Sequence, residues 1–484
     1  MSNADDCQSG ATWHNWGGNL TANPVSLCKP QTKDDLPGIL QQAKQESKTI
    51  RVLGGGYSWT PVVPTDGYII DMSCLNQILS IDQDKKQVTV EAGMRIGDLS
   101  LAIGGQPYDL EKNPIPPVVT PEDALSLQTE SVIPWITAGG AVALGCHGTG
   151  YNMGTISDEV VAMEVLLADG TWHTYSVETD GEDMMNAMRV SLGALGIIYS
   201  VTFQCVPAFN LKAVDMRANM TDTIIGIKDL VMGHDYVEVF WFPFNDEAWI
   251  KTWDKTAELP NENELEWGFD ELKEFLEIHS FGIRMMDALN NHPHMTPAIM
   301  QIFSKLMPVH PPEKPIIAPS SMVFHYQLFY IPVWDMSYCI NIPDNDFSLV
   351  QKAWTQVVNR IQALQKQGQY PQNMVMHTRY IKNSSAFLSP ASGEDHTCCI
   401  EILTFTGNNR SVDSYQGYFE AVEQDWIALG GKPHWGKAIY QVDKIKGMYG
   451  TNMDAFLNIR ETLDPEGIFL NDFLRQVFQL PASQ

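Results

Sequence analysis

The strand-like segment HTRYI, residues 377 to 381, places an imidazole and a guanidinium two positions apart. Alternate residues of a strand face the same side, so His377 and Arg379 are expected to point at one ligand. A neutral imidazole accepts a proton near neutral pH, and a guanidinium stabilises developing negative charge. The pair therefore suits a reaction in which a proton is removed and negative charge develops on a ligand, and such a ligand could lie beside a cofactor site.

Two glycine-rich segments could provide that site. RVLGGGYSWT (51 to 60) has three consecutive glycines after an apolar run, and ITAGGAVALGCHGTG (136 to 150) has five glycines. A bare backbone lets a ligand approach closely and offers N–H groups to phosphate oxygens. Neither GxGxxG nor GxxxxGK[ST] is present, which excludes the dinucleotide Rossmann and P-loop motifs. One glycine run is usually a plain turn, but two of them predict a large flat ligand with phosphates.

These two segments and SLGALGIIYSVT (191 to 202), in this order, resemble the FAD-binding domain of the vanillyl-alcohol oxidase superfamily. Further along, HTRYIKNSSAFLSP (377 to 390), PHWGK (433 to 437) and DPEGIFLNDFL (464 to 474) resemble the aldonolactone and alditol oxidases. EVFWFPFNDEAWIKTW (238 to 253) is closer to the type II cholesterol oxidases of the same superfamily. The resemblance implies a soluble FAD-dependent oxidase that takes a hydride from a CH–OH carbon and passes the electrons to O2, giving hydrogen peroxide.

The resemblance also implies where FAD binds. In many relatives the residue matching Tyr57 is a histidine bonded covalently to the flavin, so a tyrosine here predicts non-covalent FAD, with Cys146 as an alternative tether and His147 positioning the flavin loop. The expected cofactor-binding residues are Gly54, Gly55, Gly56, Tyr57, Ser58, Thr137, Ala138, Gly139, Gly140, Gly145, Cys146, His147, Gly148, Gly150, Gly196 and Ile197.

Five residues are candidates for catalysis by the same resemblance. Arg379 keeps the family pattern, whereas His377 stands where the related oxidases have a glutamate, which puts polyol recognition in doubt. Lys437 of HWGK matches a lysine beside flavin and substrate, Glu238 an acidic active-site residue of the cholesterol oxidases, and Asn471 an amide near the pocket. Three of them have a structural alternative: His377 as a core histidine, Glu238 as a solvated carboxylate and Asn471 as a turn residue.

The substrate and the reaction stay open at this level. Aromatic residues of the second half, if some face the flavin, favour a bulky, flat or partly apolar alcohol over a small polyol. The alternatives are an FAD-dependent dehydrogenase, a biosynthetic flavoenzyme that closes or desaturates a specialised metabolite, and a flavin-binding protein without turnover.

The expected fold is α+β. It comprises an FAD-binding PCMH-type domain of two α/β subdomains (1–206), a cap domain built on a large antiparallel sheet flanked by helices (207–450), and a tail that returns to the active site (451–484). Periodicity and capping predict a helix after Thr32, a strand before the first glycines, a helix near 96 to 103 and a hairpin at Asp169-Gly170. The second domain is expected to hold aromatic strands at 236–244 and 322–333, an acidic helix at 262–278 and a loop at 308–319.

Composition narrows the possible partners. The 484 residues carry a formal charge of −27, which argues against nucleic acid as a partner. No apolar run is long enough to span a membrane, and the start has no export-signal pattern, so a cytoplasmic protein is expected. The eight cysteines are scattered without zinc spacing and are expected to be reduced thiols, with no metal site. The oligomeric state is not indicated.

Overall fold

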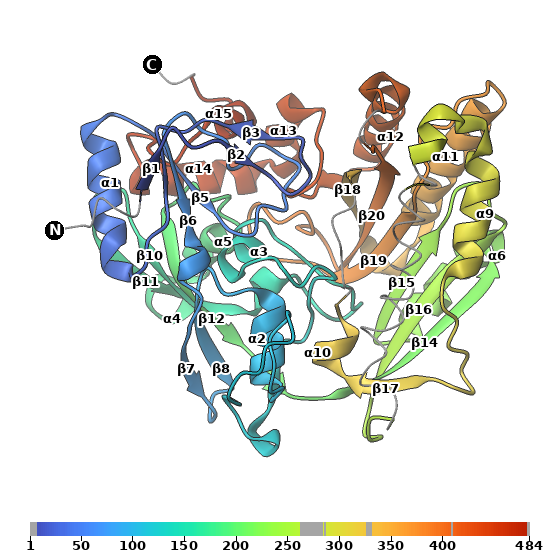
Figure 1. Ribbon diagram of the computed structural model, residues 1–484, viewed down its shortest axis with the longest axis horizontal. Helices are drawn as coiled ribbons and strands as arrows, with labels where there is room; N and C mark the ends of the chain where they lie inside the picture. The colour runs from blue at the N-terminus through green and yellow to red at the C-terminus, as the bar shows by residue number, and fades with distance from the viewer. Residues whose placement is uncertain (1–6, 262–283, 285–286, 326–331, 408–409, 482–484) are drawn as a thin grey trace.

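The computed structural model describes residues 7–261, 284, 287–325, 332–407 and 410–481 (Figure 1). Three main sheets organise the described chain, together with two short two-stranded pairs, β2 with β3 and β9 with β13. The short strands are β2 (Trp13–His14), β3 (Thr21–Ala22), β9 (Leu125–Ser126) and β13 (Val206–Pro207). Helix and sheet are mixed throughout, which confirms the α+β expectation.

The first sheet leads the chain into the first glycine-rich segment. Its order is β1-β4-β6-β5, with β4, β6 and β5 parallel. The predicted capping box at Thr32 is present, and α1 follows it and buries Leu36, Ile39 and Leu40. The elements are β1 (Cys7–Ser9), β4 (Ser26–Cys28), α1 (Leu36–Gln45), β5 (Ile50–Leu53) and β6 (Tyr68–Asp71). The glycines begin where β5 ends.

The second sheet packs against the other glycine-rich segment. Its order is β11-β10-β12-β8-β7, antiparallel throughout, and β10 and β11 form the hairpin predicted at Asp169-Gly170. The strands are β7 (Ile78–Asp82), β8 (Gln87–Glu91), β10 (Val160–Leu166), β11 (Trp172–Ser176) and β12 (Ile197–Gln204). The accompanying helices are α2 (Ile96–Ile103), α3 (Ala138–Ala143), α4 (Val177–Asp180) and α5 (Glu182–Arg189).

An eight-stranded sheet, ordered β17-β14-β16-β15-β19-β20-β18-β21, forms the other half of the molecule (Figure 1). Its strands are β14 (Asn210–Asn219), β15 (Tyr236–Trp241), β16 (Glu247–Thr256), β17 (Ile316–Pro319), β18 (Val333–Ile342), β19 (Met376–Lys382), β20 (His396–Phe405) and β21 (Lys432–Pro433). The helices here are α6 (Met220–Ile225), α7 (Ile227–Met232), α9 (Thr296–Leu306), α10 (Ser320–Val323), α11 (Ser348–Gln365) and α12 (Gln416–Ala428). This arrangement confirms the large antiparallel sheet flanked by helices.

The two faces of the large sheet have different roles because side chains alternate along each strand. Residues such as Val239, Tyr380 and Ile400 belong to a core cluster with Trp354 of α11 and Trp426 of α12. Their sequence neighbours, including Glu238, Arg379 and Glu401, lie on the opposite face. The helices therefore cover one face, and the charged residues gather on the other.

The C-terminal segment packs against the first half of the chain. It forms α13 (Ile445–Tyr449), α14 (Thr451–Leu463) and α15 (Asp472–Phe478), whose residues Phe456 and Leu474 join the core cluster of the first two sheets. The backbone N–H of Ile50 donates to the carbonyl of Ile468 over 2.8 Å. The tail thus returns to the start of the glycine-rich segment, while the domain limits at 206 and 450 stay predictions.

Several expectations need correction. The strand expected at 322–333 does not begin at residue 322, because residues 320–323 form the short helix α10 directly after Pro319. The loop expected at 308–319 is also partly wrong, since its residues 316–319 pair with β14 as β17. Residues 326–331 and the expected acidic helix at 262–278 lie outside the described residues. Four cysteines are not free thiols: Cys7 is bonded to Cys28 and Cys339 to Cys399. The two cysteines of each pair lie directly opposite each other on neighbouring antiparallel strands. Their distant positions in the sequence do not reveal this proximity.

In the part of the chain that the structure describes, no helix has both the length and the apolar character needed to cross a bilayer. The compartment stays a prediction.

Candidate active site

A cavity lies between the glycine-rich segments and the large sheet, with about 1260 Å³ of empty space, part of which is open to solvent. Eleven of the sixteen predicted cofactor-binding residues line it: Gly54, Gly55, Gly56, Tyr57, Ser58, Thr137, Gly139, Gly140, Cys146, His147 and Gly196. The other five, Ala138, Gly145, Gly148, Gly150 and Ile197, are not among its lining residues. Gly148 instead lets the chain pass Glu130, since a Cβ there would lie 2.1 Å from the Glu130 carbonyl oxygen.

The glycines bring the two segments together as well as exposing backbone. A Cβ on Gly54 would lie 2.2 Å from Thr137 Oγ1, and one on Gly139 would lie 2.9 Å from Ala92 Cβ. Gly56 has a φ of +73°, a left-handed conformation that glycine adopts without strain. The resulting wall combines bare backbone with apolar side chains such as Ile136 and Leu144. These residues fit a group with both a flat ring system and phosphates, as FAD has.

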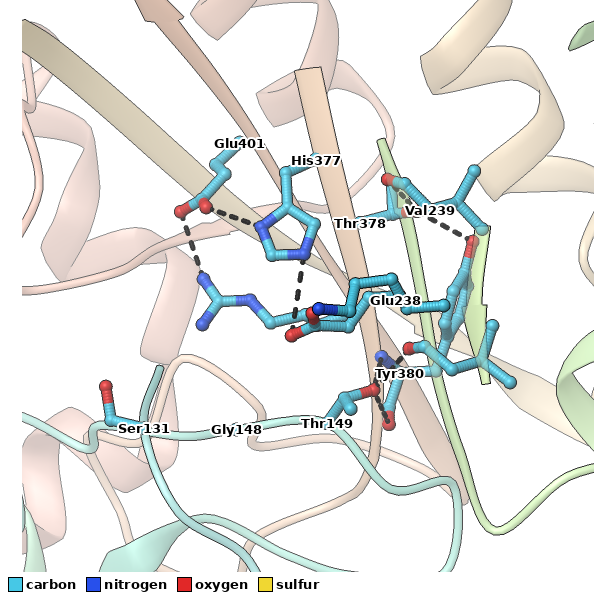
Figure 2. A network of polar contacts seen from close by, with 12 residues as sticks. Ser131, Gly148, Thr149, Glu238, Val239, His377, Thr378, Tyr380 and Glu401 are labelled. Carbon is cyan, nitrogen blue, oxygen red and sulfur yellow. Dashed lines mark hydrogen bonds and ion pairs between the residues drawn. The ribbon is translucent and has the colours of Figure 1, made fainter. Parts of the chain in front are cut away.

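Glu401 of β20 is the centre of a buried charged cluster at one end of this cavity (Figure 2). Its Oε1 lies 2.9 Å from Nδ1 of His377, and its Oε2 accepts a hydrogen bond from Nη2 of Arg379 over 3.0 Å. Lys437 Nζ lies 3.7 Å from the same Oε2. His377 is directly opposite Glu401 in the β19–β20 register, and Arg379 is opposite Cys399. The prediction that His377 and Arg379 share one face is confirmed.

His377 and Glu238 form a layer behind Glu401. Glu238 Oε1 lies 3.6 Å from His377 Nε2 (Figure 2). The ring of Phe240 stacks on the imidazole with 3.9 Å between centroids. Arg379, Glu401, His434 and Lys437 line the cavity, whereas His377 and Glu238 do not. The imidazole is therefore placed to act through Glu401.

Lys437 is held from two sides. Its Nζ is hydrogen-bonded to Oδ2 of Asp335 on β18 and lies 4.8 Å above the ring of Trp59. The neighbouring His434 accepts a hydrogen bond at Nδ1 from the N–H of Gly436 over 3.0 Å, and its ring lies 5.4 Å from that of His147. The HWGK segment thus orients Lys437 toward the charged cluster.

Burial and neighbouring charges set the ionisation of this cluster. Burial opposes ionisation of Glu401, but the charges of Arg379 and Lys437 outweigh it and hold the pKa of Glu401 well below its usual value. Burial raises the pKa of Asp335 to about 6 despite the nearby Lys437. The pKa of Lys437 lies above its usual value because Asp335 and Glu401 outweigh its burial.

The two cavity histidines are neutral. Burial, together with Lys437 and Arg379, lowers the pKa of His434 to about 3. Burial and Arg379 likewise hold the pKa of His147 well below its usual value. The positive charge at this end of the cavity therefore comes from Arg379 and Lys437.

Sequence reasoning missed Glu401 and Asp335. Each is a single acidic residue within an otherwise apolar strand, in CCIEILTF and PVWDMSY, and both are buried. Acidic residues are rarely buried unless they are paired, so an acidic residue inside a core strand predicts a charged partner nearby. Their partners could not be named, because those partners come from other strands and from the HWGK segment.

Arg51 was also missed. It is buried at the cavity, where its Nε donates to the carbonyl of Val62 over 2.7 Å and its Nη atoms donate to the carbonyls of Gly193, Leu192 and Phe469. Burial lowers its pKa to about 9. These bonds join the glycine-rich segment to the tail.

Asn471 lies apart from the charged cluster. Its Oδ1 caps α15 by accepting from the N–H of Leu474, and its Nδ2 donates to the carbonyls of Pro61 and Pro64 over 2.8 and 2.9 Å. It is not among the residues that line the cavity. These contacts favour the structural reading of Asn471, which holds the loop after the first glycines.

Comparisons with known proteins identify related sequences and a related fold. A model of the D-arabinono-1,4-lactone oxidase family matches residues 201–477, more than half of the chain, and an FAD binding domain model matches residues 24–112. The chain is 28% identical over 466 residues to an L-gulono-1,4-lactone dehydrogenase of Mycobacterium tuberculosis, with 96% of this chain and 98% of that protein covered. It is 29% identical over 478 residues to the L-gulonolactone oxidase of Mus musculus, with 97% and 98% covered.

Among solved structures, the cholesterol oxidase from B. sterolicum is similar with a TM-score of 0.77 over 98% of this chain and 97% of that one. The sequence identity is 16%, so this likeness concerns the fold.

Proposed function

The chain belongs to the D-arabinono-1,4-lactone oxidase family and is an FAD-dependent oxidoreductase acting on CH–OH groups; we propose that it oxidises an aldonolactone or a similarly small, ring-hydroxylated molecule. The observation that carries this proposal is the carboxylate of Glu401 at the cavity wall. A carboxylate can accept hydrogen bonds from two hydroxyl groups, which suits a sugar-derived substrate. Glu401 thereby supplies a carboxylate from β20, next to position 377, where the related oxidases have a glutamate and this chain has a histidine.

The surrounding cations prepare Glu401 for that role. Arg379 and Lys437 keep it ionised, so its oxygens act as acceptors, and each cation also presents positive charge to the cavity. When bound in this cavity, FAD would supply the acceptor for the hydride of the CH–OH carbon. Arg379 and Lys437 stabilise the negative charge that develops at this end of the cavity during that transfer.

Glu401 receives the hydroxyl proton in this proposal. Its Oε1 lies 2.9 Å from Nδ1 of His377, which donates a hydrogen bond to the ionised carboxylate and holds it in place. The proton moves from the substrate hydroxyl to Glu401 as the hydride leaves the CH–OH carbon, and His377 acts as a positioning residue behind it.

Oxygen is the proposed electron acceptor, with hydrogen peroxide as the product, as the name L-gulonolactone oxidase implies for the mouse relative. A second candidate is a dehydrogenase that reacts poorly with oxygen, because the mycobacterial relative carries that name. FAD is proposed to be bound without a covalent link, since Tyr57 lines the cavity at the expected tether position.

An anaerobic reduction screen tests the substrate class. The purified FAD-loaded enzyme would be mixed with aldonolactones, linear polyols, sterols and aromatic alcohols, and bleaching of the oxidised flavin would be followed by absorbance. We expect bleaching by aldonolactones. Bleaching by sterols or aromatic alcohols alone would refute the proposal, and peroxide release under air would separate an oxidase from a dehydrogenase.

A further inference from the structure

Two buried cysteines and a histidine meet beside the Glu401 cluster. Cys339 of β18 lies directly opposite Cys399 of β20, and their sulfurs form a disulfide. Cys399 shares a strand face with Glu401 because the two are separated by one residue. His147 belongs to the second glycine-rich segment, and one of its ring nitrogens lies within 4.8 Å of both sulfurs. The three side chains therefore come together from both halves of the molecule.

His147 presents an unused lone pair in this place. Its Nδ1 lies 2.9 Å from the carbonyl oxygen of Gly148 and must carry a proton to donate to it. The other nitrogen, Nε2, is then an acceptor, and it is buried without a hydrogen-bond partner among the described residues. A buried polar atom without a partner usually indicates an unseen water or ion. Two sulfurs and a bare imidazole nitrogen are the donors that zinc prefers.

We propose that Cys339 and Cys399, in their dithiol form, bind one zinc ion together with Nε2 of His147. An external thiol reductant supplies two electrons, which together with two protons convert the disulfide into two thiols, and the reductant becomes a disulfide itself. Zinc binding then releases both thiol protons, because thiolates are the ligands. Two cysteines and one histidine leave a fourth position for water, an arrangement that zinc accepts.

The backbone requires little change for this site. Zinc–sulfur bonds of ~2.3 Å in a tetrahedral site hold two sulfurs ~3.8 Å apart. The Cα atoms of Cys339 and Cys399 are 4.0 Å apart, so rotation about the Cα–Cβ bonds can separate the sulfurs that far. The ion would join β18 and β20 to His147, whose carbonyl accepts a hydrogen bond from Arg379. It would thus tie the FAD-binding segment to the large sheet.

The test uses the FAD-loaded enzyme produced in a reducing host and purified anaerobically with a thiol reductant. Zinc content would be measured by mass spectrometry after equilibrium with excess zinc and desalting, and the thiols would be counted under denaturing conditions. We expect about one zinc per chain in the reduced enzyme and less than about a tenth of that after disulfide formation. Zinc-edge X-ray absorption should show two sulfur ligands and at least one nitrogen.

Matched variants locate the site. Cys339→Ser and Cys399→Ser should lose the bound zinc, whereas Cys398→Ser should keep it, because Cys398 belongs to the core cluster on the opposite face of β20. Cys28→Ser should keep it as well, since Cys28 lies in the other disulfide. The proposal is overturned by zinc-free reduced enzyme, by zinc retained in Cys399→Ser, or by Cys339 and Cys399 that stay oxidised in the native enzyme under reductant.

Discussion

Glu401 lies directly opposite His377 in the pairing of β20 with β19, and its Oε1 is 2.9 Å from the imidazole Nδ1. This pair places a carboxylate at the cavity wall and an imidazole immediately behind it. The position where related oxidases have a glutamate thus carries a histidine, and the neighbouring strand supplies the acid. Glu401 contacts the cavity and His377 holds Glu401 in place, which makes their roles separable by mutation.

Glu401→Gln should slow flavin reduction about 10²- to 10⁴-fold and raise the substrate concentration needed for half-maximal rate. The amide retains the shape but accepts fewer hydrogen bonds and leaves Arg379 and Lys437 without their shared anion. Stopped-flow absorbance under anaerobic conditions measures both quantities. Glu401→Asp, which keeps the charge, should recover part of the rate. If Glu401→Gln reduces the flavin as fast as the native enzyme, Glu401 has no role in catalysis.

His377→Gln should lower the rate of flavin reduction by about 10- to 10²-fold while changing substrate affinity little, because the imidazole does not line the cavity. The loss would come from a Glu401 carboxylate that no longer receives the hydrogen bond from Nδ1. Anaerobic stopped-flow absorbance measures the rate. An unchanged rate in His377→Gln would instead support its reading as a core histidine.

Lys437→Met should slow flavin reduction by about 10²- to 10³-fold, a loss of ~3 to 4 kcal/mol of transition-state stabilisation. The variant removes a cation from the cavity and leaves Asp335 without its partner. Lys437→Met combined with Asp335→Asn provides the control, because it removes both charges together. If the double variant regains the native rate, the defect of the single variant comes from the unpaired carboxylate and the prediction fails.

Asp335 should make the flavin reduction potential depend on pH near 6. Its pKa of about 6 means that it is ionised above that pH and protonated below it, while Lys437 remains charged. As the pH falls through 6, Asp335 is protonated and the cluster loses one negative charge. This change favours an anionic reduced flavin and therefore raises the flavin reduction potential. Dye-equilibration measurements between pH 5 and 8 should show this inflection.

The variant Asp335→Asn is the matched control for that measurement. It should have a potential at pH 7.5 about 20 to 40 mV above that of the native enzyme, since ~1.4 kcal/mol corresponds to ~30 mV for a two-electron couple. The inflection near pH 6 should also disappear in the variant. Its persistence would assign the titration to another group.

Non-covalent FAD is expected because Tyr57 occupies the tether position. Acid precipitation of the purified protein should therefore release the yellow cofactor into the supernatant, where its spectrum identifies free FAD. Cys146 also lines the cavity, and burial raises the pKa of its thiol to about 11, which disfavours the reactive thiolate. Colour retained in the pellet of the native protein but released from Cys146→Ser would show a cysteine link.

The sequence by itself determined the main elements and half of the site. Glycine runs, capping at Thr32 and strand alternation are local properties, so α1, the hairpin of β10 and β11, and the shared face of His377 and Arg379 could be read from neighbouring residues. Motif order predicted the FAD-binding segments and Lys437, and residues of these segments line one cavity with Lys437. None of these predictions depends on which distant segments meet.

Only the tertiary structure decided which charges pair. Glu401 and Asp335 lie on β20 and β18, and neither their approach to Arg379 and Lys437 nor the joining of Cys339 to Cys399 follows from spacing along the chain. Strand order in a sheet is a long-range property, because it depends on which segments far apart in the sequence pair with each other. Contacts across neighbouring strands, and the pKa values that burial gives them, therefore appear only once the fold is known.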